Sequence, residues 1–132
     1  AVQRALLELQ QLGVGVAIDD FGTGYSSLSY LKDLPIRCIT IDRSFIADLG
    51  KPRNAPQFAL ALVEAIVGIA RTLDLEVVAE GIETLARQEL VEDLGCEFGQ
   101  GFLFSRPITA DAVEAMLYLP QPHQAQDLGR YN

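Results

Sequence analysis

Four short apolar runs alternate along the chain with longer segments in which apolar residues recur every three to four positions. The runs cover residues 14–18, 37–41, 76–79 and 98–103. Runs of four to six residues are typical of strands, whereas the 3.6-residue period is typical of helices. The run 14–18 contains only glycine and apolar residues, so we expect a strand that is buried on both faces, as in a parallel sheet.

The intervening segments predict helices over residues 1–12 and 57–73, and three more that begin near Ser26 or Ser27, at Thr84 and after Thr109. Gly13 and Gly95 are placed to end helices, and residues 52–56 are expected to form a loop. A helix followed by four strand–helix units predicts an α/β fold with a parallel sheet and right-handed crossovers. Four such units make half of an eight-stranded barrel or a small open sheet, and the pattern leaves both open.

Carboxylate or amide side chains follow every predicted strand: Asp19 and Asp20, then Asp42, then Glu80 with Glu83, then Gln100. In a parallel barrel these strand ends meet at one face. Clustered carboxylates repel one another unless a cation is bound, and oxygen ligands suit Mg²⁺, Mn²⁺ or Ca²⁺. An Asp-Asp pair before a turn is by itself more often a turn signal or a helix cap. The coincidence at four strand ends therefore carries the metal-site hypothesis.

The adjacent pair Asp19 and Asp20 raises a geometric problem for that hypothesis. Successive side chains of a strand point to opposite faces, so both acids can face one site only if the chain kinks there. Gly22 and Gly24 follow the pair, and we expect these glycines to permit the kink.

Composition narrows the possible ligands. The 132 residues are 49% apolar, which is enough for a packed core, and the net charge is −8. Such a charge disfavours nucleic acid, and a phosphodiester ligand would need a cation to screen it. No apolar run reaches the roughly 18 residues of a membrane span. The chain opens inside a predicted helix without an initiator Met, so we expect a segment of a longer protein.

Four motifs in a fixed order carry a resemblance: AIDDFGTGYSSL at 17–28, TIDRSFI at 40–46, VVAEGIET at 77–84 and GCEFGQGFLFSRP at 95–107. Together they resemble the EAL-domain phosphodiesterases of bacterial cyclic di-GMP signalling. The resemblance covers residues 1–119 and implies the C-terminal half of a TIM-like (β/α)8 barrel, with four parallel βα units. Residues 120–132 are expected to form a flexible polar tail.

The resemblance implies hydrolysis of cyclic di-GMP to linear pGpG with Mg²⁺ or Mn²⁺ at a two-metal site in the intact domain. Asp19 and Asp20 match the metal-binding pair, and Glu80 and Glu83 match catalytic acids. Gln100 matches a substrate-binding glutamine at the edge of the site. Gly22, Thr23 and Gly24 match part of the family's flexible loop and are also expected to bind substrate.

Two departures from the family pattern change this expectation. Thr40 stands where the family has a lysine, and losing one such electrostatic group commonly costs on the order of 10²–10³ in rate. The Glu-Ala-Leu strand and the other N-terminal metal ligands are not in the chain. The chain alone is therefore expected to be inactive, and its intact parent to be the hydrolase. The alternatives are a non-hydrolytic cyclic di-GMP receptor or interaction scaffold and, more remotely, another metal-dependent barrel enzyme.

The same resemblance predicts partners and location. A half-barrel has open sheet edges, so we expect a homodimer or pairing with the missing half-barrel. Upstream sensory or GGDEF domains are possible, and nucleic acid is not expected as a partner. The expected location is cytoplasmic, in a parent that could be anchored to a membrane.

Overall fold

The structure, a computed structural model, describes residues 2–24, 28–51 and 56–119. The predicted caps Ser26 and Ser27, most of the predicted loop 52–56 and the predicted tail 120–132 lie outside the described residues. The helices are α1 (Val2–Gln11), α2 (Leu28–Asp33), α3 (Arg43–Asp48), α4 (Pro56–Thr72), α5 (Leu85–Asp93) and α6 (Ala110–Leu117).

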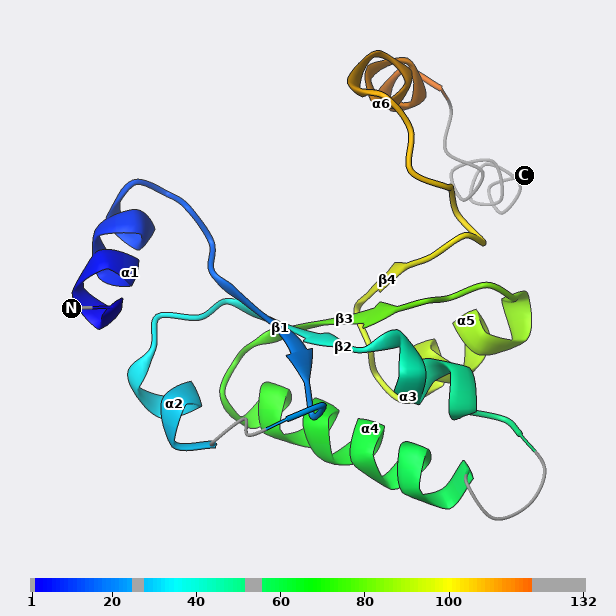
Figure 1. Ribbon diagram of the computed structural model, residues 1–132, viewed down its shortest axis with the longest axis horizontal. Helices are drawn as coiled ribbons and strands as arrows, with labels where there is room; N and C mark the ends of the chain where they lie inside the picture. Colours follow the sequence, from blue (N-terminus) through cyan, green and yellow to red (C-terminus); the bar gives the residue numbers. More distant parts are fainter. Residues whose placement is uncertain (1, 25–27, 52–55, 120–132) are drawn as a thin grey trace, which may run out of the picture.

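The described strands form one parallel sheet whose order follows the chain (Figure 1). They are β1 (Ala17–Phe21), β2 (Cys38–Ile41), β3 (Glu76–Glu80) and β4 (Phe98–Gln100), in the order β1-β2-β3-β4. A doubly wound sheet reverses its strand order at a switch point, and these four strands have no reversal. The observed order is therefore that of a barrel segment, one of the two architectures left open by the sequence.

Most helices begin and end where the sequence predicts. Thr84 and Thr109 cap α5 and α6 by accepting hydrogen bonds from the backbone N–H of Arg87 and Ala112. Gly13 and Gly95 follow α1 and α5 with φ angles of 82° and 94°, the left-handed conformation that glycine adopts without strain.

Three elements differ from the prediction. The strand expected at 14–18 is wrong by three residues, because the ladder with β2 begins only at Ala17, opposite Cys38. The last strand ends at Gln100 rather than at residue 103, because the chain turns at Gly101 and the Leu103 N–H donates to the Ile82 carbonyl instead. The short helix α3 was not predicted at all.

One face of the sheet is buried and the other is open. Ile39, Ile41, Val77 and Ala79 alternate along β2 and β3 and are at most 2% exposed; α3 and α4 pack against β3 on the helix-covered side. The alternate residues, such as Thr40 and Val78, are only half-buried, and all of β4 is exposed. The expectation that the strand at 14–18 is buried on both faces is therefore wrong, because none of the described helices covers the second face of the sheet.

Two helices stand away from the sheet, and one groove between helices is apolar. Neither α1 nor α6 contains a buried residue, and Figure 1 shows both at a distance from the strands.

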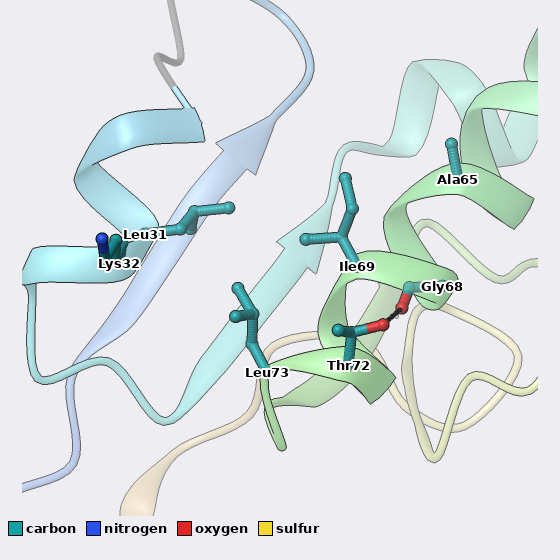
Figure 2. A pocket seen from close by; sticks show the side chains of 7 residues that line it. All are labelled: Leu31, Lys32, Ala65, Gly68, Ile69, Thr72 and Leu73. Carbon is teal, nitrogen blue, oxygen red and sulfur yellow. Dashed lines mark hydrogen bonds between the residues drawn. The ribbon is translucent and has the colours of Figure 1, made fainter.

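A groove of about 640 Å³ lies between α2 and α4. Figure 2 shows its lining, mainly Leu31, Ile69 and Leu73, at the end of α4 that leads into the start of β3. This groove therefore lies at the opposite ends of the strands from the acids.

Candidate functional site

A bulge at the end of β1 brings the two adjacent aspartates to one side. Ile18 pairs with Ile39 and Phe21 pairs with Ile41, so two residues of β1 oppose the single residue Thr40 of β2. Such a bulge re-aims side chains at a strand end. Asp20 has a φ of 51°, a left-handed conformation in which aspartate is several-fold enriched over most residues. The predicted kink exists at Asp20 itself, and Gly22 just beyond it also has a positive φ, of 96°.

Three carboxylates converge at this point. One oxygen each from Asp19, Asp20 and Glu80 lies within 4.8 Å of the other two. The charge of Asp19, together with some desolvation and the nearby Asp42, raises the pKa of Asp20 above its usual value. Partial burial and then the charges of Asp19 and Asp20 raise the pKa of Glu80. Repulsion between these carboxylates therefore opposes their ionisation, and a bound cation would offset this repulsion.

Thr40 is hydrogen-bonded to both aspartates. Its hydroxyl donates to Asp19 Oδ1 at 2.7 Å and accepts from the backbone N–H of Asp20 at 3.2 Å. The same N–H also lies 2.9 Å from Asp19 Oδ1. The residue that replaces the expected lysine is thus hydrogen-bonded to the carboxylate cluster, although it brings no positive charge.

Asp42 begins α3 instead of joining the three clustered carboxylates. Its side chain accepts hydrogen bonds from the Ser44 N–H, at 2.8 Å, and from the Ser44 hydroxyl. These bonds hold the pKa of Asp42 below its usual value. An aspartate two residues before a serine at the end of a strand was the signal that could have predicted α3.

A small cavity of about 180 Å³ joins the ends of β3 and β4. It is lined by Arg43, Glu80, Gly81, Glu83, Gln100, Gly101 and Phe102. The register explains why two of the predicted residues meet there, because Glu80 is the ladder partner of Gln100. Arg43, the first residue of α3, brings a positive charge to this cavity. It was not among the predicted catalytic, substrate-binding or metal-binding residues.

Gly81 allows Arg43 to approach the end of β3. Its φ is 76°, and a Cβ at this position would lie 2.5 Å from the Arg43 Cβ and 3.2 Å from its Cα. Any side chain would therefore push α3 away from Glu80.

Not all predicted site residues are brought together. Glu83 lines the cavity, but it is not one of the three clustered carboxylates, and its Oε2 lies 3.9 Å from Arg87 Nη1.

Gly22, Thr23 and Gly24 are absent from the cavity lining. A Cβ on Gly22 would meet Phe45 and Leu62 instead, while the Thr23 hydroxyl donates to the Asp20 carbonyl at 2.8 Å. The described part of this loop thus contacts the bulge and the core rather than the cavity.

The chemistry of these donors fits a hard divalent cation. Three carboxylates within reach of one point supply the oxygen ligands that Mg²⁺ and Mn²⁺ prefer. The raised pKa values of Asp20 and Glu80 show that the cluster is short of positive charge. The described cluster supplies three ligands, fewer than the six that Mg²⁺ takes, so further ligands must come from water, substrate or other protein groups.

Comparison with known sequences identifies relatives of the chain. The model of the EAL domain family matches residues 1–107. The bifunctional diguanylate cyclase/cyclic di-GMP phosphodiesterase MucR of Pseudomonas aeruginosa is 51% identical over 110 residues. That match covers 83% of this chain but only 16% of MucR, so the chain spans about a sixth of the length of that relative.

Solved structures give the same result. The chain matches the PaMucR phosphodiesterase in complex with c-di-GMP at a TM-score of 0.76 and 50% identity, over 84% of this chain and 43% of that one. It matches Klebsiella pneumoniae BlrP1, in a manganese/cy-diGMP complex, at a TM-score of 0.68 and 37% identity, over 80% of this chain and 26% of that one. No helix among the described residues is long and apolar enough to cross a membrane. The four-stranded parallel sheet, its acidic strand ends and these matches show that the chain belongs to the EAL domain family.

Proposed function

We propose that these residues form one half of an active site that hydrolyses cyclic di-GMP to linear pGpG with Mg²⁺ or Mn²⁺. The observation that carries the proposal is the convergence of Asp19, Asp20 and Glu80 in a chain of this family. Support comes from MucR and BlrP1, relatives whose solved structures are complexes with cyclic di-GMP, one of them with manganese.

Each residue of the site has a proposed task. Asp19, Asp20 and Glu80 hold the divalent cation, which supplies Lewis acidity toward a phosphodiester. Gln100 and Arg43 line the adjoining cavity, where an amide and a guanidinium can bind the substrate's polar and phosphate groups.

The remaining residues are proposed to support the site. Glu83 lies near Arg87 at the cavity wall and is a supporting acid. Gly22, Thr23 and Gly24 act through the bulge, because Thr23 is hydrogen-bonded to Asp20.

A second function, binding without hydrolysis, is favoured by one observation. Thr40 offers a neutral hydroxyl to Asp19 where the family has a lysine, so the described site lacks that charge beside the acids. A receptor or scaffold could bind cyclic di-GMP through the same cavity and cation without accelerating its cleavage.

Titration calorimetry of cyclic di-GMP into the intact parent protein with Mn²⁺, with chromatography of the products, separates the two functions. Binding with appearance of pGpG supports hydrolysis. Binding without product supports the receptor, and Thr40→Lys is then expected to restore turnover by about 10²-fold or more. Absence of binding would contradict both functions.

We also propose that the site is completed by a second half-barrel, either a second copy of this chain or the remainder of an EAL domain. The open face and the exposed strand β4 support this pairing. A cytoplasmic location and attached sensory or GGDEF domains stay predictions.

A further inference from the structure

The bulge in β1 leaves a backbone donor that the strand ladder does not use. Asp19 and Asp20 together oppose Thr40, and regular pairing resumes only at Phe21. The extra residue of a bulge loses its ladder partner, and an unpaired backbone N–H is unfavourable once it is shielded from water. Here the Asp20 N–H donates to the Thr40 hydroxyl at 3.2 Å. The Thr40 hydroxyl thus supplies one acceptor for this N–H, and Asp19 Oδ1 supplies the other.

The same hydroxyl also orients the Asp19 carboxylate. It donates to Oδ1 at 2.7 Å, and the Asp20 N–H reaches the same oxygen at 2.9 Å. Among the described residues, both hydrogen bonds of this carboxylate end on Oδ1, which leaves Oδ2 for a cation. A hydroxyl can donate and accept at the same time. Lysine can donate to Asp19 but offers no acceptor to the Asp20 N–H, and valine can do neither.

We propose that Thr40 is a positioning residue of the metal site, whose hydroxyl locks the bulge so that Asp19 and Asp20 face Glu80 together. This inference rests on the proposed function, because it requires the three carboxylates to bind a divalent cation. It also assigns Thr40 a different task from that of a lysine. The hydroxyl arranges ligands and supplies no charge to the substrate.

Binding of Mn²⁺, followed by electron paramagnetic resonance of the free ion, tests the role without relying on turnover. Groups that orient metal ligands typically contribute 10–100-fold to affinity. Thr40→Val keeps the shape but removes the hydroxyl, and we expect its dissociation constant to rise about tenfold or more. Thr40→Ser keeps the hydroxyl and is expected to bind Mn²⁺ within about threefold of the unsubstituted protein.

Thr72→Val is the matched control for the loss of a threonine hydroxyl. Thr72 donates to the Gly68 carbonyl inside α4, at 2.9 Å, and lines the groove between α2 and α4 instead of the cavity beside the acids. We expect this variant to leave Mn²⁺ affinity unchanged. Thermal unfolding followed by circular dichroism in EDTA shows which variants are folded. If Thr40→Val does not fold, Thr40→Ala takes its place, since it also lacks the hydroxyl and should bind Mn²⁺ more weakly.

The outcomes separate this inference from the proposed function. Equal Mn²⁺ affinity in the unsubstituted protein and in folded Thr40→Val would overturn the role of Thr40 and leave the metal site standing. Weak binding by a folded Thr40→Ser would also overturn it, because the hydroxyl is retained there. No Mn²⁺ binding by the unsubstituted protein would overturn the metal site and the role of Thr40 together.

Discussion

At the scale of single residues, repulsion among the clustered carboxylates lowers the free energy of unfolding. The charge of Asp19 raises the pKa of Asp20, and burial followed by the neighbouring acids raises the pKa of Glu80. A carboxyl whose pKa is raised by folding takes up protons more readily in the folded state. Its effect on the free energy of unfolding therefore becomes unfavourable as the pH rises through the raised pKa. Metal-binding clusters commonly carry such a cost in stability.

Asp20→Asn is expected to raise the melting temperature by a few degrees at pH 7 in EDTA. The substitution removes repulsion with Asp19, and asparagine tolerates the φ of 51° as well as aspartate does. The gain should disappear near pH 3, below the usual value of 3.8, where the carboxyl is protonated in both states. Mn²⁺ should raise the melting temperature of the unsubstituted protein but not of the variant. Scanning calorimetry checks both effects, and a lower melting temperature of the variant at pH 7 would contradict the repulsion.

At the scale of elements, sequence periodicity predicted long helices well and strand ends poorly. The apolar stripe of α4 and the threonine caps of α5 and α6 are local signals, and they gave the correct helices. The start of β1 and the end of β4 depend on pairing with other strands, which no local pattern contains. For the same reason a kink at the aspartates and the convergence of Asp19, Asp20 and Glu80 could be predicted. The bulge opposite Thr40 that forms this kink, the hydrogen bonds of Thr40 and the separate position of Asp42 could not.

The short helix α3 depends on its cap, which gives a test at this scale. Six-residue helices are marginal by themselves, and Asp42 supplies acceptors for the Ser44 N–H and hydroxyl. Asp42→Ala should lower the free energy of unfolding by about 1 kcal/mol, measured by urea denaturation at pH 7. Asp42→Ser retains an acceptor and should remain close to the unsubstituted protein.

The effect of the cap should also depend on pH. Because the hydrogen bonds from Ser44 lower the pKa of Asp42, the carboxylate stabilises the fold above its usual value of 3.8. This stabilisation is lost as the pH falls through the lowered pKa. The difference between Asp42→Ala and the unsubstituted protein should therefore shrink in strong acid, and an undiminished difference would contradict a charged cap.

At the scale of the whole molecule, no helix among the described residues covers one face of the sheet, and the edge strand β4 is exposed. Phe98 of β4 is 51% exposed, and its ladder partner Val78 lies on the open face. Parallel sheets are found almost only with both faces covered, and an exposed apolar edge strand favours pairing with another chain. We therefore expect the chain to associate in solution, with a sedimentation coefficient that rises with concentration.

The matched pair Phe98→Lys and Phe58→Lys tests which surface causes the association. Phe58 is 70% exposed on α4, away from the strands, so its substitution controls for the change in net charge and hydrophobicity. Lysine on an edge strand disfavours pairing, and loss of a buried phenylalanine contact should weaken association at least about tenfold. We expect this loss for Phe98→Lys alone. A monomeric unsubstituted chain, or equal weakening by both variants, would show that the open sheet is not the surface that takes up a partner.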